Sequence, residues 1–285
     1  MVKIMDPKTH IGLVHLIVSN LEESCDFYLN KIGFKELVRD GSTVSLTANG
    51  KTPLVILEER EDAKVKPERT TGLYHFAILV PNRASLGQSL LHLLQVGYPL
   101  QGASDHGFSE AVYLADPDGN GIEIYADRPR EQWEKTQNGE YKAITMAMDA
   151  EGVLAEASNG GWAGLPDETV IGHIHLHVDN LIAAENFYID GIGFEKTIKM
   201  AESALFVSAG GYHHHLGLNV WAGIGAPHPP LDSLGLKHYT IEVAGNSDLD
   251  EMAARLHSIG AEYVMEDGFI RTADPSGNVV LILAG

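Results

Sequence analysis

The sequence predicts an α+β protein built from four βαβββ modules, and two repeats carry this prediction. Residues 27–34 recur as residues 187–194, with Phe-Tyr at the start and Ile-Gly-Phe at the end of both copies. A second pair of units interleaves with the first, because the turn sequence of residues 116–120 returns in similar form at residues 274–278. The chain is therefore an internal duplication, and each copy contains two modules.

Within a module, the sequence predicts a strand, a helix and then three short strands. The opening strand is expected at residues 13–18 and again at residues 171–178, which are rich in branched aliphatic residues. Asn20 and Asn180 follow these strands and are suited to cap a helix, because a side-chain oxygen can accept hydrogen bonds from the free N–H groups of the first turn. The helix is expected to end near the Ile-Gly-Phe turn, where glycine tolerates a left-handed backbone. Residues 43–47 are one of the short strands.

The four modules are expected at residues 9–58, 72–126, 169–221 and 235–284. Residues 1–126 would then form a first domain and residues 169–285 a second. The connector between them, residues 127–168, is polar at first and has a predicted helix near residues 150–157.

Composition restricts the partners. The net charge of −19 argues against electrostatic binding to nucleic acid or to anionic membranes. No apolar stretch approaches the roughly 20 residues of a spanning helix. Cys25 is the only cysteine, which excludes an intrachain disulfide, and we interpret it as a small core residue. We predict a cytoplasmic protein that acts on a small molecule, with a homo-oligomer as an open alternative to a monomer.

Residues 105–125 are predicted to form two strands joined by the turn Asp116-Pro117-Asp118-Gly119. Alternation in the second strand places Glu123 and Tyr125 on one face, with Ile122 and Ile124 on the other. By composition alone, Glu123 would be a solvent-facing residue. If it is buried, it requires a positively charged partner.

This organisation resembles the vicinal oxygen chelate superfamily, which includes glyoxalase I, bleomycin-resistance proteins and type I extradiol dioxygenases. The resemblance implies that modules pair into open, curved mixed sheets, which bind a divalent metal through their first and last strands. The matching first-strand positions are Leu13, His75, His173 and His238. At the last strand, Glu123 is the one carboxylate, and Leu281 stands at the equivalent position of the fourth module.

The same stretch resembles the signature of extradiol dioxygenases, in which a histidine precedes an aliphatic-tyrosine pair, Asp-Pro-x-Gly and a glutamate. His106, Tyr113, residues 116–119 and Glu123 fit this order, whereas Ser104 departs from the residues usual two places before the histidine. The run 212–218 resembles the motif that carries the acid–base histidine of the family, although a His-His-His run alone would suggest an exposed strand end.

The resemblance implies a role for each candidate. His75, Glu123 and His173 would hold the metal, and His214 would be the acid–base residue. Tyr113 and His106 would donate hydrogen bonds to substrate oxygens, and His175 would face the substrate. His213, Asn219 and His238 are further candidates for substrate binding, and His238 is alternatively a core histidine or the relic of a lost site.

Two imidazoles and one carboxylate are the ligand set of non-haem Fe(II) oxygenases. The resemblance therefore implies an Fe(II)-dependent extradiol dioxygenase, with Mn(II) as a substitute ion, that cleaves catechol or a substituted catechol with O2. A glyoxalase-type isomerase, which would want a second carboxylate, and a metal-free protein that sequesters an aromatic ligand are the alternatives.

The ligand set also predicts which modules pair. The second and third modules together supply His75, Glu123 and His173, whereas the third and fourth supply His173 and His238 but have Leu281 in place of the carboxylate. We therefore expect the second module to pair with the third. The proline-rich loop 222–233 is long enough to cover a site, and the sequence leaves open whether it does.

Overall fold

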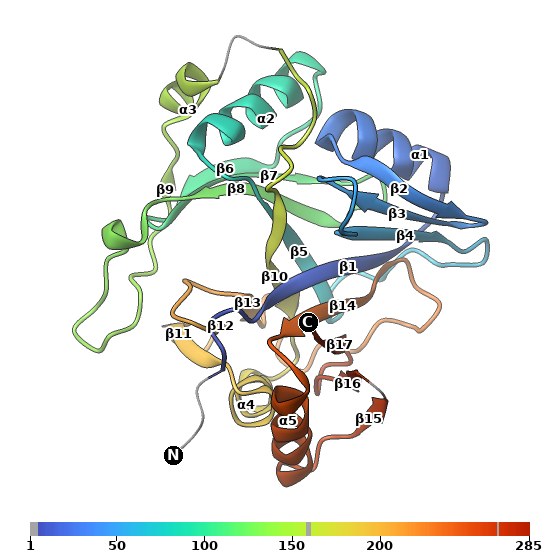
Figure 1. Cartoon of the computed structure of the whole chain (residues 1–285), viewed down its shortest axis with the longest axis vertical. Coiled ribbons are helices and arrows are strands. Elements are labelled where there is room, and N and C mark those ends of the chain that lie inside the picture. Colours follow the sequence, from blue (N-terminus) through green and yellow to red (C-terminus); the bar gives the residue numbers. More distant parts are fainter. Residues whose placement is uncertain (1–4, 158–160, 267) are drawn as a thin grey trace.

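A computed structural model describes residues 5–157, 161–266 and 268–285. These residues form two curved mixed sheets with a few helices, and the α+β prediction is confirmed (Figure 1). In the first half of the chain the elements are β1 (His10–Val18), α1 (Leu21–Asp26), a π-helical turn (Phe27–Ile32), β2 (Lys35–Asp40), β3 (Thr43–Thr47), β4 (Val55–Glu59), β5 (Gly72–Leu79), α2 (Arg83–Gln95), β6 (Gly102–Asp105), β7 (Ser109–Ala115) and β8 (Gly121–Asp127).

The connector contributes a 3-10 turn (Arg130–Gln132), β9 (Met146–Ala147) and α3 (Ala150–Glu156), and this last helix was predicted. The second half repeats the order of the first with β10 (Val170–His177), α4 (Leu181–Glu185), a π-helical turn (Asn186–Ile192), β11 (Glu195–Met200), β12 (Ala204–Ser208), β13 (Leu216–Asn219), β14 (Gly235–Val243), α5 (Asn246–Ser258), β15 (Tyr263–Glu266), β16 (Phe269–Ala273) and β17 (Val279–Ala284).

The predicted helix caps are present. The Asn20 side chain accepts a hydrogen bond from the backbone N–H of Glu23 at 2.9 Å, and Asn180 caps α4 in the same way. Gly33 and Gly193 end the two helical segments with φ of 97° and 107°, values that only glycine adopts readily. The sequence did not predict that each of these segments changes from α-helix to π-helix halfway along.

The strand order shows which modules pair. One sheet runs β15-β16-β17-β14-β1-β4-β3-β2, and the other runs β11-β12-β13-β10-β5-β8-β7-β6-β9. The second and third modules therefore share a sheet through the antiparallel pair β5 and β10, and the first and fourth share the other through β1 and β14. The expected pairing of the second module with the third is confirmed. The division into domains at residues 1–126 and 169–285 stays a prediction, because each sheet takes one module from either side of the connector.

Helices from the same half of the chain lie near each other, whereas each sheet combines strands from both halves. Helices α1 and α2 gather at one end of the molecule, and α4 and α5 gather at the other (Figure 1). Strands β1 and β10 lie between these ends and contribute fully buried side chains to one continuous core, among them Leu16 and Leu176. Burial of these apolar faces leaves the opposite, polar face of each central strand free to build a site.

The connector is bound to both modules of the second sheet. Arg83 of α2 forms ion pairs with Glu110 of β7 and with Asp149 and Glu156 beside and within α3, which fixes one end of the connector. Earlier in the connector, the backbone N–H of Tyr141 donates to the carbonyl of Thr197 at 2.9 Å. The connector therefore contacts the third module first and then returns to the second, where β9 pairs with β6.

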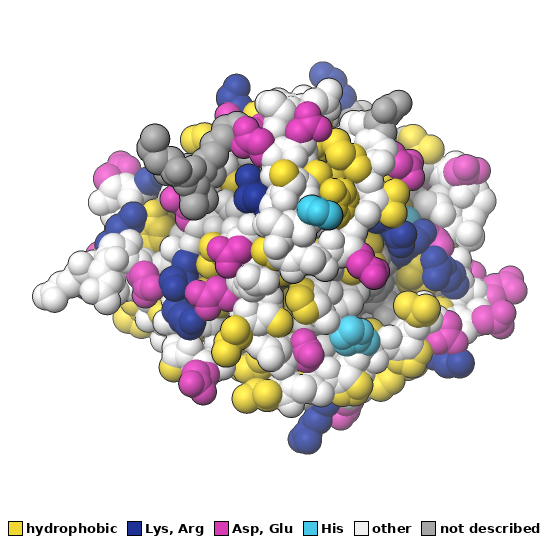
Figure 2. All heavy atoms as spheres, turned by 90° about the horizontal axis from the view of Figure 1, so that it is seen from below, with side chains coloured by type: hydrophobic (Ala, Val, Ile, Leu, Met, Phe, Trp, Pro, Cys, Tyr) yellow, Lys and Arg dark blue, Asp and Glu magenta, His cyan; other side chains and the backbone are white. Residues whose placement is uncertain are grey.

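Cys25 is buried, as expected for a core residue. None of the helices formed by the described residues is long and apolar enough to cross a membrane. The face in Figure 2 has acidic, basic and apolar side chains interspersed over its described atoms.

Candidate metal centre and active site

Three side chains predicted as metal ligands converge on one point of the second sheet. Strand β5 carries His75 and lies between β8, which carries Glu123, and β10, which carries His173. The Oε2 atom of Glu123 lies 3.0 Å from Nε2 of His75 and 3.2 Å from Nε2 of His173. One potential ligand atom from each residue lies within 4.8 Å of the other two, so the three residues can hold a metal ion.

The distances fit an ion bound between these atoms. Ligand bonds of about 2.1 Å at right angles place neighbouring ligand atoms about 3.0 Å apart, which is close to both observed distances. The Nε2 atom of His75 also has no aligned hydrogen-bond partner among the described residues, although it is buried and near Glu123. A buried lone pair without a hydrogen bond is unfavourable unless it binds something else. The geometry therefore suits a metal ligand better than an ordinary histidine–carboxylate hydrogen bond.

The electrostatics agree with this role. Only 3% of Glu123 is exposed, and burial alone would raise the pKa of its carboxyl, but the rings of His173 and His75 hold that pKa well below its usual range. Burial lowers the pKa of His173 to about 4. An ionised carboxylate and a neutral imidazole are the protonation states that bind metal ions.

A cavity of about 480 Å³ opens beside these three residues. Its wall is mostly apolar or aromatic and includes Tyr74, Phe108, Ile198, Met200, Phe206 and Trp221. Glu123 is the one acidic residue in the lining, and no lysine or arginine is among the described residues that form it. The space and its surface suit a small aromatic ring without a charged substituent.

His214 and His175 reach this cavity, as predicted. The ring of His214 lies 4.2 Å from that of His173, and burial lowers the pKa of His214 well below its usual value. The Nε2 atom of His175 is buried without a hydrogen-bond partner among the described residues. A β-carbon on Gly217, in the neighbouring strand β13, would lie 2.8 Å from the ring of His175, so glycine at this position leaves room for the ring.

Tyr113 and His106 also line the cavity, but they bind each other. The Tyr113 hydroxyl lies 2.7 Å from Nε2 of His106, and Nδ1 of His106 lies 3.0 Å from the carbonyl oxygen of Ile144. Since a carbonyl only accepts, Nδ1 carries the proton and Nε2 accepts from the tyrosine. Both nitrogens of His106 are therefore engaged, and its donation to a substrate stays a prediction that requires one of these bonds to break.

Two of the three further substrate-binding candidates lie behind the cavity wall. His213 is fully buried and bonds to His214 and Asp127. Asn219 is also fully buried, and its side chain bonds to Nδ1 of His177 at 2.7 Å. Neither residue is part of the described lining.

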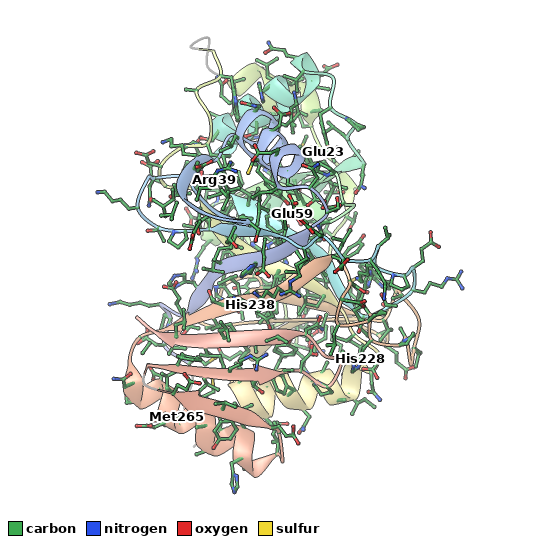
Figure 3. All side chains as sticks on the ribbon, turned by 90° about the vertical axis from the view of Figure 1, so that its right-hand side faces the viewer. Glu23, Arg39, Glu59, His228, His238 and Met265 are labelled. Carbon is green, nitrogen blue, oxygen red and sulfur yellow. The ribbon has the colours of Figure 1, made fainter. Side chains whose placement is uncertain are left out.

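His238 is not brought to the cavity at all, because it lies on β14 in the other sheet (Figure 3). There it lies opposite His15 of the neighbouring strand β1. His75 and His175 lie opposite each other in the same way on β5 and β10 of the second sheet. Leu281 pairs with Thr240 where Glu123 pairs with Ala77, so an apolar side chain takes the place of the carboxylate. The nearby Glu58 lies 2.9 Å from Nε2 of His15 and also forms ion pairs with Lys237 and Arg60. His238 is outside the described lining of the cavity, so its substrate-binding role stays a prediction without support from this position, whereas its interpretation as the relic of a site fits this register.

Sequence reasoning missed several residues of the lining. Ala143, Ile144 and Thr145 belong to the connector, which has no periodic pattern that could place it at the site. The loop 222–233 lies outside the described lining. It packs elsewhere, since the backbone N–H of Thr71 donates to the carbonyl of Pro227.

Comparisons with known proteins agree with the geometry. Residues 10–124 match the Glyoxalase/Bleomycin resistance protein/Dioxygenase superfamily. The chain is 49% identical over 269 residues to the catechol-2,3-dioxygenase of Bacillus subtilis (strain 168), which covers 94% of each protein. It is 32% identical over 102 residues to biphenyl-2,3-diol 1,2-dioxygenase 3 of Rhodococcus globerulus, which covers 33% of this chain and 54% of that one. The crystal structure of glyoxalase I from Zea mays has the same fold, with a TM-score of 0.61 at 14% identity over 97% of this chain and 92% of that one.

Proposed function

The chain belongs to the glyoxalase/bleomycin resistance protein/dioxygenase superfamily, and we propose that it is an Fe(II)-dependent extradiol dioxygenase that cleaves catechol or a substituted catechol with O2. The observation that supports this most is the convergence of two histidines and one glutamate, His75, His173 and Glu123, beside a small aromatic-lined cavity. An ion held by these three side chains alone would have positions open for a substrate and O2. The name of the relative with 49% identity points to the same reaction.

The proposed ion is Fe(II), with Mn(II) as a substitute, and when bound it would orient both reactants and transfer electron density between them. The chain's own residues would bind the ring and move its protons. Tyr74, Trp221 and Phe206 are placed to hold an aromatic ring within the cavity. Nε2 of His175 has no hydrogen-bond partner among the described residues and is suited to bond a substrate hydroxyl.

His214 is the proposed acid–base residue. It lies in the lining next to His173, and burial favours its neutral form, which can accept a proton from a catechol hydroxyl and return it later. Tyr113 lies on the opposite side, where its ring is 5.8 Å from that of His75, and would orient a substrate oxygen.

The isomerase alternative has weaker support, because Glu123 is the single carboxylate of the described lining. A direct test is O2 uptake by protein that has been loaded anaerobically with Fe(II) and then mixed with catechol. We expect one O2 to be consumed per catechol, with formation of a yellow ring-opened semialdehyde. Isomerisation of a thiol hemithioacetal, with no O2 uptake on any catechol, would instead assign the isomerase function.

We also propose a cytoplasmic location and two domains at residues 1–126 and 169–285. The second proposal is supported by the positions of the helices, because α1 and α2 lie at one end of the molecule and α4 and α5 lie at the other (Figure 1).

A further inference from the structure

A row of three side chains leads away from the cavity behind His214; the two histidines are buried, and the side chain of Asp127 at the end of the row is 23% exposed. The Nδ1 atom of His214 lies 2.8 Å from Nδ1 of His213, and Nε2 of His213 lies 2.9 Å from Oδ1 of Asp127. Asp127 is the last residue of β8, four positions after Glu123, whereas both histidines precede β13 in the third module. The row therefore joins the two modules at the site.

The surroundings hold the middle ring of this row in one orientation. His213 is fully buried, and Phe108 stacks on it with ring centroids 4.4 Å apart and an angle of 15° between the planes. Trp133 of the connector packs against the same ring, with ring centroids 5.2 Å apart and an angle of 64° between the planes. A ring packed in this way cannot turn to exchange its two nitrogens without displacing its neighbours.

The hydrogen bonds in the row determine where the protons lie. The Asp127 carboxylate only accepts, so Nε2 of His213 carries a proton. In neutral His213, Nδ1 then has a lone pair, and the short contact with His214 requires a proton on Nδ1 of His214. Neutral His214 is thereby left with an unprotonated Nε2, which is the form that can act as a base.

Without an acceptor at position 127, the opposite arrangement becomes available. His213 could carry its proton on Nδ1 and donate to His214, whose own proton would then lie on Nε2. That tautomer of His214 could donate to a substrate but could not accept its proton. The carboxylate therefore decides between two chemically different forms of the same residue.

We propose that Asp127 is a positioning residue which, through His213, fixes neutral His214 as the tautomer with its proton on Nδ1 and its Nε2 lone pair free. The use of this lone pair rests on the proposed function. There, the O–H bond of a catechol hydroxyl breaks, an N–H bond forms at Nε2 of His214, and the products are a catecholate and an imidazolium whose Nδ1–H still donates to His213.

The tautomers can be read by NMR of the iron-free protein labelled with ¹⁵N-histidine. Two-bond ¹H–¹⁵N correlations distinguish protonated from unprotonated ring nitrogens, and the signals are assigned by their loss in His213→Gln and His214→Gln. We expect the wild type to have His213 protonated on Nε2 and His214 protonated on Nδ1. In Asp127→Ala, and also in Asp127→Asn, whose amide can donate as well as accept, the single form should give way to a mixture.

Kinetics of the iron-loaded protein provide a second readout. Asp127→Ala should lower kcat about 10- to 100-fold with little change in KM or iron content. Glu131→Ala, which removes an exposed negative charge from the connector, is the matched control and should behave as the wild type. If the alanine variant does not fold, Asp127→Asn, which keeps the shape of the side chain, serves for both measurements.

A wild-type His214 protonated on Nε2, or tautomers that do not change in either Asp127 variant, would overturn the proposal. The NMR measurement needs no turnover, so it can be read even if the protein is not a dioxygenase. If the tautomers are as expected but the protein does not cleave catechol, the proposed function is rejected and the positioning role of Asp127 is retained.

Discussion

The Oε2 atom of Glu123 lies 3.2 Å from Nε2 of His173, although the two residues are 50 positions apart and their strands are not neighbours. Strand β5 separates β8 from β10 and carries His75, the third candidate ligand. The site therefore exists only because the second and third modules share a sheet. The sheet of the first and fourth modules has the same strand arrangement, but there Leu281 occupies the position that corresponds to Glu123.

The first prediction concerns the proposed acid–base residue. His214→Ala should retain iron, because His214 is outside the cluster of potential ligands, but should lower kcat by about 10²- to 10⁴-fold. Steady-state O2 uptake and iron analysis of the same preparation test this. Turnover at the wild-type rate would show that the assignment is wrong.

A negative charge on the substrate should lower kcat/KM, because no lysine or arginine is among the described residues of the lining. A carboxylate on the ring would have no cationic partner among these residues, and its desolvation costs at least about 1–3 kcal/mol. We expect kcat/KM for 3,4-dihydroxybenzoate to be about 10- to 100-fold below that for 4-methylcatechol. Met200→Lys adds a cation to the lining and should narrow this gap, whereas equal rates on both substrates in the wild type would contradict the neutral-ring preference.

Gly217→Ala tests whether the position of His175 matters. The new β-carbon would lie 2.8 Å from the imidazole, so the ring must move, and a displacement of this kind should lower kcat/KM about 10- to 100-fold. Gly245→Ala is the control, because in the described part of the chain no heavy atom outside the neighbours of Gly245 lies within 4 Å of the added carbon, and φ is 173°, an extended backbone. Equal activity of both variants would remove His175 from the site.

Stability should fall in mild acid because of His215. Burial lowers its pKa to about 3, and its Nδ1 accepts a hydrogen bond from the backbone N–H of Ala209, which protonation would break. Between about pH 6.5 and pH 3 the unfolded chain binds a proton that the folded protein does not, so the free energy of unfolding decreases as the pH falls, by up to about 1.4 kcal/mol per unit.

Urea unfolding in the presence of a chelator at pH 7, 6 and 5 measures this dependence. His215→Gln keeps an acceptor for Ala209 but does not titrate, so its unfolding free energy should change less over this range. Identical slopes for both proteins would show that His215 is not the cause.

Much of the fold was predictable because the chain repeats itself. The repeat predicted where each module begins and ends. Asn20 and Asn180 predicted where the helices start, because capping depends on residues that are close in the sequence. The shared sheet of the second and third modules was also predictable, because Leu281 cannot replace a carboxylate ligand.

The rest depends on contacts between distant and irregular segments. Strand β13 begins only at Leu216, so residues 212–215 have no alternation that shows which histidine faces the cavity. A family resemblance pointed to His214, but nothing in the sequence linked His213 to Asp127. The connector is likewise positioned by the packing of Trp133 and Tyr141 against Phe108 and Tyr212, and not by a sequence period.

The most direct test of the account is the iron content of His75→Ala and His238→Ala, measured side by side after anaerobic loading with Fe(II) and removal of free metal. Loss of one of three protein ligands should release the ion or weaken its binding severely, and circular dichroism shows whether each variant is folded. We predict about one iron per chain in the wild type and in His238→Ala, and little or none in folded His75→Ala. Iron retained by His75→Ala and lost from His238→Ala would contradict the assignment of the metal centre.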